Sequence, residues 1–302
     1  MSAGSRPALT PGTALLLTVP PVLWAGNAIV GRLVRDAVPP MTLNLIRWTI
    51  ALAVLVPLGR AALRAGSGVL ANWRRYSLLG LLGVGLYNSL QYLALQSSSP
   101  INVTLVASGV PVWMLLVGRL FFGVPVRRRQ VAGAILSIAG VLVVMSRGDP
   151  AQLAALRLVA GDVYMILATI AWSFYSWLLM QPKDVPGLRA DWAAFLLAQV
   201  AHGVLWSGVL AGGEWALRDV RIAWSWPLAA ALLYVAIGPA IIAMRCWGAG
   251  VQRAGPSLGA FFINLTPLFT ALLSSAFLGE APHLYHVLAF AMIVGGIAIS
   301  AR

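Results

Sequence analysis

Charged residues are scarce in this sequence of 302 residues, and acidic residues most of all. Only 10% of the residues are charged and eight are Asp or Glu, whereas 60% are hydrophobic and the mean hydropathy is +0.86. Because a soluble domain carries about 25% charged residues, this composition excludes an ordinary soluble protein and indicates one surrounded mostly by lipid. The single cysteine, Cys246, excludes an intrachain disulfide.

Long polar loops are also absent, and the apolar runs between short breaks are long enough to cross a bilayer, which takes roughly 20 residues. The first run is too long for the core of a signal peptide, so we expect it to be retained. The sequence therefore predicts an all-α polytopic membrane protein with ten transmembrane helices. We expect these helices over residues 13–33, 40–59, 76–97, 101–122, 129–146, 160–180, 190–211, 227–251, 257–278 and 283–301.

The net charge of +13 comes from basic residues that lie mainly in the short loops. In a soluble protein such a charge would suggest nucleic acid. Here the basic residues alternate between the two sides of the predicted bundle, with twice as many on the side of the N-terminus, so we expect the lipid bilayer as partner and no nucleic acid. The positive-inside rule then predicts a multi-pass protein of the cell (inner) membrane with both termini in the cytoplasm.

An internal repeat relates the two halves of the chain. A shift of 156 positions places Pro100 on Pro256 and Pro111 on Pro267, and the match continues without a gap for more than forty residues. Because each half has five spans, an odd number, the second half must enter the membrane from the opposite side. The pattern predicts two inverted five-helix repeats, residues 1–148 and 149–302, an arrangement typical of transporters with a substrate site near the midplane.

Short motifs lie along both halves in a fixed order and spacing. They are Trp24-Ala25-Gly26-Asn27, Arg47-Trp48, Ala94-Leu95, Pro111, Gly161-Asp162, Ala171-Trp172, Pro267 and Leu278-Gly279-Glu280. With these motifs the chain resembles the EamA-type family of the drug/metabolite transporter superfamily over nearly its whole length. One departure is Gly123-Val124, where the family pattern of the first half has Gly-Glu.

The resemblance implies ten helices with both termini inside the cell. It also implies a central cavity lined by helices one to four and six to nine, with helices five and ten at the periphery. Family members that have been characterised largely export amino acids and other metabolites. The glycines of helices five and ten are expected to allow close helix packing; these include Gly133, Gly140, Gly295 and Gly296.

No acidic residue occurs between Asp36 and Asp149, or between Asp219 and Glu280. None of the predicted spans has a carboxylate near its middle. Exporters of cations and many proton-coupled pumps depend on such a buried carboxylate. The sequence therefore disfavours a cationic substrate, and it disfavours proton coupling through a membrane Asp or Glu.

Two arginines, Arg47 and Arg245, do lie within predicted spans. A cation in the membrane is costly unless it faces the bundle interior or water. If either arginine faces the cavity, it suits the carboxylate of an amino acid or an organic acid. The alternative is that each side chain snorkels to the interface or bonds carbonyls at a helix end.

Other polar side chains recur at helical spacing within the spans, where lipid forces them to point inward. They either contact the substrate or form hydrogen bonds between helices. Together with the two arginines, the candidate substrate-binding residues are Trp24, Asn27, Asn44, Asn88, Gln91, Tyr92, Trp172, Tyr175, Gln199 and Asn264. Pro111 and Pro267 are expected to kink their helices and serve as hinges or free a carbonyl for the cavity, with a static kink as the alternative.

These features together predict a secondary transporter, an exporter of amino acids or related zwitterionic or anionic metabolites, that works by alternating access without cofactor or metal. Two other classes stay open: a non-transporting scaffold or sensor, and an intramembrane enzyme. The enzyme reading rests on a G-x-S-x-G string at Gly255–Gly259, which here opens an apolar helix instead of following a strand. The oligomeric state is not readable from the sequence.

Overall fold

The computed structural model describes residues 9–98, 103, 106–154, 159–181, 183–278 and 283–301, and within these residues all regular structure is helical. Uninterrupted spans are α1 (Pro11–Leu33), α2 (Pro40–Leu58), α7 (Arg128–Met145), α9 (Ala160–Met180), α11 (Trp192–Leu217) and α16 (Leu284–Ala301). Composite spans are α3 (Trp73–Gly80) with η2 (Leu81–Leu86) and α4 (Tyr87–Ser97), α12 (Trp226–Val235) with η3 (Ala236–Ile242) and α13 (Ala243–Ala254), and α14 (Pro256–Ile263) with α15 (Leu265–Leu278). The remaining helices are η1 (Arg60–Leu63), α6 (Val110–Phe122), α8 (Pro150–Ala154) and α10 (Pro186–Ala190).

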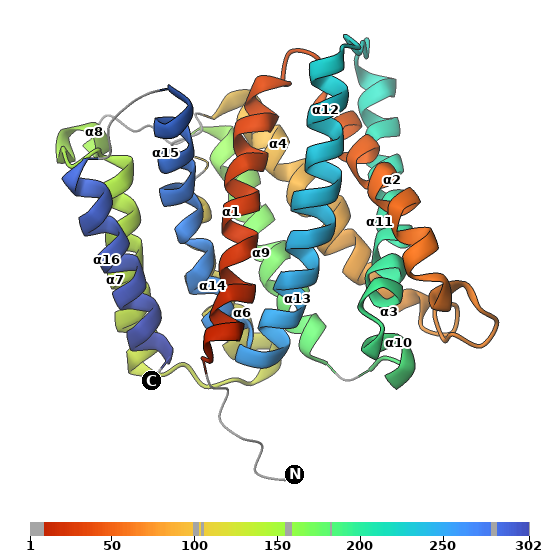
Figure 1. Ribbon diagram of the computed structural model, residues 1–302, viewed down its shortest axis with the longest axis horizontal. Coiled ribbons are helices and arrows are strands. Elements are labelled where there is room, and N and C mark those ends of the chain that lie inside the picture. Colours follow the sequence, from red (N-terminus) through yellow and green to blue (C-terminus); the bar gives the residue numbers. More distant parts are fainter. Residues whose placement is uncertain are drawn as a thin grey trace.

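The prediction of a helical bundle that crosses the membrane many times is confirmed. Within the described residues, nine helices are long and apolar enough to cross a membrane. The tenth predicted span, 101–122, is represented by the shorter apolar helix α6, and part of its first half lies outside the described residues. The elongated helices stand side by side, with the start of α1 and the end of α16 on the same face (Figure 1), which we call the terminal face.

Local sequence sets where the helices begin and end. Side-chain oxygens of Thr10, Asp191 and Ser225 accept backbone N–H bonds at the starts of α1, α11 and α12, as N-cap residues do. Gly123 ends α6 with a φ of 66°, and Gly255 separates α13 from α14 with a φ of 83°. Both conformations favour glycine because a side chain would be strained there.

Irregularities of the helices follow the repeat. The third span is wound as a π-helix over Leu81–Leu86, and the eighth span over Ala236–Ile242, positions that the shift of 156 relates closely. Such segments are rare and are frequent at functional sites. Helix pairing repeats as well: α1 packs against α13 and α15, and its counterpart α9 packs against α4 and α6. The two halves therefore form inverted copies of one bundle.

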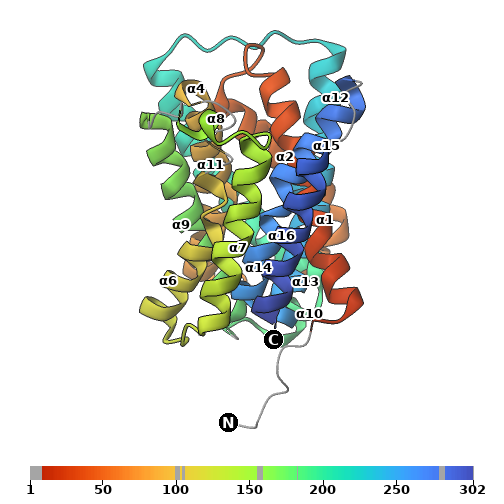
Figure 2. The same cartoon turned by 90° about the vertical axis from the view of Figure 1, so that its left-hand side faces the viewer.

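Helices α7 and α16 pair at one side of the bundle (Figures 1 and 2), as the family resemblance implied. A Cβ added to Gly133 would lie 2.6 Å from the carbonyl oxygen of Gly296, and one on Gly296 would lie 2.7 Å from that of Gly133. Gly140 similarly meets Ala289. Close packing through these three glycines is confirmed.

The seventh span is longer than predicted. Helix α11 continues to Leu217, beyond the expected end at 211, and brings Glu214 into the bundle with 8% of its surface exposed. The Glu214 carboxylate accepts bonds from the backbone N–H groups of Met41 and Thr42 at 3.2 and 2.9 Å and from the Thr42 hydroxyl. Glu214 thus caps the start of α2, near the face opposite the terminal face. Because Glu214 lies close to the end of α11, the middle of α11 is still without a carboxylate.

Candidate functional site

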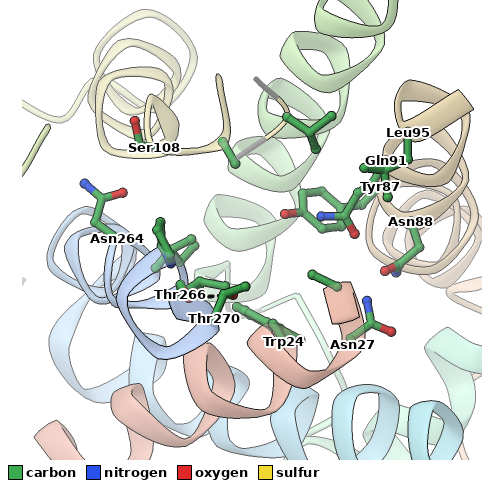
Figure 3. A pocket seen from close by; sticks show the side chains of 15 residues that line it. Trp24, Asn27, Tyr87, Asn88, Gln91, Leu95, Ser108, Asn264, Thr266 and Thr270 are labelled. Atoms are coloured by element: carbon green, nitrogen blue, oxygen red, sulfur yellow. Dashed lines mark hydrogen bonds between the residues drawn. The ribbon is translucent and has the colours of Figure 1, made fainter. Parts of the chain in front are cut away.

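A cavity of about 70 Å³, measured as the volume open to the centres of water molecules, lies between the two repeats. That volume exceeds what one ordered water needs. Its walls come from the half of α1 far from the terminal face, from α4, from the segment before α6, and from the junction of α14 and α15 (Figure 3). The lining residues are Trp24, Asn27, Ala28, Tyr87, Asn88, Gln91, Leu95, Val103, Ala107, Ser108, Ile263, Asn264, Thr266, Pro267 and Thr270.

One wall of the cavity is formed where the fourth and ninth spans are interrupted. The chain makes a turn at Ser108 and Gly109 before α6 begins, and α14 ends at Ile263 with a turn at Asn264 before α15 begins. Ser108 and Asn264 are related by the shift of 156 and both line the cavity. Broken helices at the midplane are a recurrent way to expose polar groups to a transported substrate.

The prolines lie just after these interruptions. Pro111 is in the first turn of α6, and Pro267 is the third residue of α15. The prediction that both prolines kink continuous helices is therefore wrong, because each span is interrupted before its proline. Since proline has no N–H, Pro111 cannot donate to the carbonyl of Ala107 four residues earlier, and Pro267 cannot donate to that of Ile263. Both carbonyls belong to lining residues. A hinge role for the prolines remains a prediction.

The opposite wall is backed by the buried guanidinium of Arg47, which is 1% exposed. Its Nη1 donates to Asn88 Oδ1 at 2.9 Å, to the Tyr92 hydroxyl at 3.1 Å and to Asn27 Oδ1 at 3.3 Å. Tyr92 in turn donates to Asn27 Oδ1 at 3.1 Å. Because arginine has only donors, this contact requires both asparagines to present their oxygens to Arg47.

Arg47 therefore does not snorkel to the interface, and that alternative is wrong. Its Nε has no hydrogen-bond partner, and no carboxylate of the described residues lies within ion-pairing distance of it. The guanidinium lies 5.1 Å from the Trp48 ring centroid, a favourable cation–π contact. Arg47 is absent from the cavity lining and reaches the cavity only through Asn27 and Asn88.

An aromatic cluster fills the bundle beside the cavity. Trp172 is 2% exposed, and its ring lies 5.2 Å from that of Trp24, 5.0 Å from that of Tyr87, 5.1 Å from that of Tyr175 and 5.4 Å from that of Trp247. These separations are typical of favourable ring pairs. Since Trp24 and Tyr87 also line the cavity, the cluster gives the cavity an apolar floor.

Several predicted site residues bond neighbouring helices away from the cavity. Asn44 donates to the Val84 carbonyl and to the hydroxyls of Ser89 and Ser207 at 3.0 to 3.2 Å. Gln199 accepts from the Tyr175 hydroxyl at 3.0 Å. These three predicted residues, Asn44, Tyr175 and Gln199, are all buried and are absent from the lining.

Arg245 does not face the cavity. Its side chain is exposed on the outside of α13, and its guanidinium lies 4.2 Å from the Trp192 ring centroid at the start of α11. Among the predicted site residues, Asn27 and Gln91 line the cavity and Trp172 supports its floor, whereas Arg245 lies elsewhere. Arg245 is thus withdrawn from the candidate site.

Four lining residues with polar groups were not among the predicted site residues: Tyr87, Ser108, Thr266 and Thr270. Ser108 could have been identified, because the shift of 156 relates it to the predicted Asn264. The two threonines carry no comparable sequence signal. Threonine is common in membrane helices, where its hydroxyl can bond a carbonyl of its own helix, as Thr270 does with Thr266 at 2.9 Å.

The bundle is tied together on the terminal face by an ion-pair network. Asp184, whose side chain is fully buried, pairs with Arg75 at 2.6 Å and with Arg189 at 3.0 Å, and it accepts from the Tyr76 hydroxyl at 3.0 Å. Arg75 and Tyr76 begin the third span, whereas the other two residues follow the sixth. The network therefore joins the two repeats on the side of the aromatic floor away from the cavity.

Comparison with known proteins agrees with this architecture. The model of the EamA-like transporter family matches residues 12–146 and 159–302. The chain belongs to this family. A protein of Archaeoglobus fulgidus named as an uncharacterized transporter is 27% identical over 95% of this chain and 96% of its own length. The aromatic amino acid exporter YddG of Ancylobacter novellus is 28% identical, covering 92% and 93%.

A solved crystal structure superposes on 98% of this chain and 97% of its own, with a TM-score of 0.71 and 25% identity. The family and the named relatives are transporters and not enzymes. This EamA-family chain is accordingly a multi-pass membrane transporter whose fold consists of two inverted helical repeats.

Proposed function

We propose that this transporter exports amino acids or related zwitterionic or anionic metabolites by alternating access through the cavity between the repeats. The observation that carries the proposal is the pair of amides, Asn27 and Asn88, that line the cavity with the cation of Arg47 behind them. Their oxygens are occupied by Arg47, so their N–H groups are left for a ligand. Donors backed by a buried cation suit a carboxylate.

The distribution of closed and hollow regions supports alternating access. The cavity occupies the half of the bundle away from the terminal face, whereas the aromatic cluster and the Asp184 network close the terminal side. The inverted repeats supply a second arrangement, related to the first by the pseudo-two-fold axis between them, in which the closed side opens. Exporter YddG, a relative over nearly the whole chain, supports an amino acid as cargo and export as the direction.

The same proposal includes topology and partition. We place the protein in the cell (inner) membrane with both termini in the cytoplasm, because basic loop residues favour the terminal face. Residues 1–148 and 149–302 are proposed as the two repeats. A scaffold or sensor is the competing reading. It is disfavoured because a buried polar cavity costs free energy and a scaffold has no use for one.

Reconstitution tests the proposal. Purified protein in liposomes loaded with a mixture of radiolabelled amino acids is expected to release label faster than protein-free liposomes, and the assay is run with and without a pH gradient. Gln91→Ala removes an amide from the cavity, whereas Gln96→Ala removes an exposed amide from the same helix, α4. We expect Gln91→Ala to slow efflux at least several-fold and Gln96→Ala to leave it unchanged.

The proposed cargo would be wrong if every labelled amino acid left protein-containing and protein-free liposomes at the same rate, both with and without the pH gradient. If Gln91→Ala and Gln96→Ala transport at equal rates, the substrate path does not involve the Gln91 side of this cavity.

A further inference from the structure

The two walls of the cavity differ in the hydrogen-bonding groups they offer. In Figure 3, Asn27, Asn88 and Gln91 lie on one side of the cavity, and Asn264 and Thr266 on the other. We call the two asparagines of the first side, Asn27 and Asn88, the donor wall. The second we call the acceptor wall (Asn264 and Thr266, with the backbone carbonyls of Ala107 and Ile263).

Chemistry fixes the polarity of the donor wall. The single Arg47 Nη1 group faces Asn27 Oδ1 and Asn88 Oδ1, and Tyr92 donates to the first of these oxygens as well. An inverted amide would place N–H against N–H, so neither asparagine can turn its oxygen to the cavity while these bonds persist. The wall therefore presents N–H groups, and the cation behind them polarises these groups further.

The acceptor wall contains buried oxygens without donors. Asn264 is 0% exposed; its Nδ2 donates to Ser137 Oγ at 2.9 Å, and its Oδ1 has no hydrogen-bond partner. Thr266 Oγ1 has none either. An unmet buried polar group costs roughly 1–3 kcal/mol, so two of them beside one cavity call for a ligand that supplies donors.

The bond to Ser137 fixes this wall as the Arg47 bonds fix the other. Because the Asn264 amide nitrogen is held by the Ser137 hydroxyl on α7, the Asn264 oxygen is left on the side of the cavity. The carbonyls of Ala107 and Ile263, which the prolines deprive of their helical donors, lie on the same broken spans. Every one of these groups accepts hydrogen bonds, and none carries a charge.

We infer that the cavity reads both ends of an α-amino acid, binding the carboxylate at the donor wall and the ammonium at the acceptor wall. The inference rests on the proposed function and narrows it: amines and monocarboxylates, which each have one matching end, are discriminated against. The apolar side chain of the amino acid is left to the floor, where Trp24 and Tyr87 offer ring faces. An ammonium held by neutral oxygens also explains how the site operates without a carboxylate among its described lining residues.

Three probes that differ only at their ends test the inference: phenylalanine, phenethylamine, which lacks the carboxylate, and 3-phenylpropionate, which lacks the ammonium. Binding is measured by calorimetry on the purified protein. We expect phenylalanine to bind at least ten-fold more tightly than either analogue, since each analogue leaves one wall unpaired. If 3-phenylpropionate binds as tightly as phenylalanine, the assignment of the acceptor wall is wrong. If phenethylamine binds as tightly as phenylalanine, the assignment of the donor wall is wrong.

A gain of binding guards against variants that merely misfold. Asn264→Asp keeps the shape of the side chain and turns the acceptor wall anionic; the bond that Asn264 donates to Ser137 is replaced by one that the carboxylate accepts from the Ser137 hydroxyl. We expect this variant to bind phenethylamine at least five-fold more tightly than the wild type and to bind 3-phenylpropionate less tightly. Thr266→Val is expected to weaken phenylalanine several-fold, whereas Thr49→Val, at an exposed threonine of α2, leaves all three affinities unchanged.

The outcomes separate this inference from the proposed function. If labelled amino acids leave the liposomes but the three probes bind equally, or Asn264→Asp shifts none of them, the two-wall assignment is wrong and the exporter stands. If no labelled amino acid moves and no probe binds, both are wrong.

Discussion

Replacing Arg47 with methionine removes a buried cation while keeping an unbranched apolar side chain. The guanidinium touches no lining space itself, so any effect on ligand binding must pass through Asn27 and Asn88. Two consequences are expected. The electrostatic attraction of the donor wall for a carboxylate is lost, and the two amides are no longer held with their oxygens away from the cavity.

The electrostatic part can be worked from the contacts. Arg47 Nη1 lies 2.9 Å from Asn88 Oδ1. A carboxylate oxygen bound by the nitrogen of that amide lies one amide group and a second hydrogen bond further on, roughly 8 Å from the cation. At an effective dielectric constant of about 20, unit charges at this separation attract by about 2 kcal/mol, which is roughly a 30-fold change in Kd.

Calorimetry with phenylalanine and phenethylamine on wild type, Arg47→Lys and Arg47→Met measures this effect. Phenylalanine affinity is expected to fall about 30-fold in Arg47→Met and less in Arg47→Lys, which keeps the charge but loses the planar fork. Phenethylamine has no carboxylate, so its affinity should stay the same or rise. An equal loss for both ligands in Arg47→Met, with the fold intact by thermal melting, would refute an electrostatic role.

Two further predictions concern the bundle itself. Asp184→Asn breaks a buried ion-pair network and should cost about 3–5 kcal/mol, whereas Asp219→Asn, in a pair that is largely exposed, should cost less than about 1 kcal/mol; similar melting temperatures of the two variants would contradict this. Gly133→Ala forces a Cβ to within 2.6 Å of the Gly296 carbonyl oxygen and should lower thermal stability by about 1–3 kcal/mol. In Gly208→Ala the added Cβ meets nothing within 4 Å, so thermal stability should stay unchanged. An equal loss of stability in Gly208→Ala would count against the close α7–α16 contact.

The fold was predictable because its signals are local. Apolar length alone placed nearly every span within a few residues, and the proline and glycine matches between halves revealed the inverted repeat. The interruptions at Ser108 and Asn264 were not predicted, because the spans that contain them read as continuous apolar runs. The end of α11 was predicted too early because residues 211–217, which include Glu214, resemble a segment at the membrane–water interface. In the structure the Glu214 carboxylate accepts hydrogen bonds at the start of α2, and the helix continues.

Which polar residues face the cavity was harder to predict, because a membrane helix that is apolar on all sides does not show which face points inward. Arg47 and Arg245 look alike in sequence. One is buried among Asn27, Asn88 and Tyr92, and the other stacks on Trp192 outside the bundle. Only the positions of neighbouring helices, set by packing between distant parts of the chain, distinguish the two arginines.

Passage of the substrate through this cavity can be tested at one small lining residue. Ala28→Cys, in a chain whose own thiol is removed by Cys246→Ser, places a single reactive group in the cavity wall. A membrane-impermeant thiol reagent is predicted to stop amino acid efflux from liposomes, and phenylalanine should slow the labelling. If the modified protein exports as fast as the Cys246→Ser parent, the substrate does not pass through this cavity.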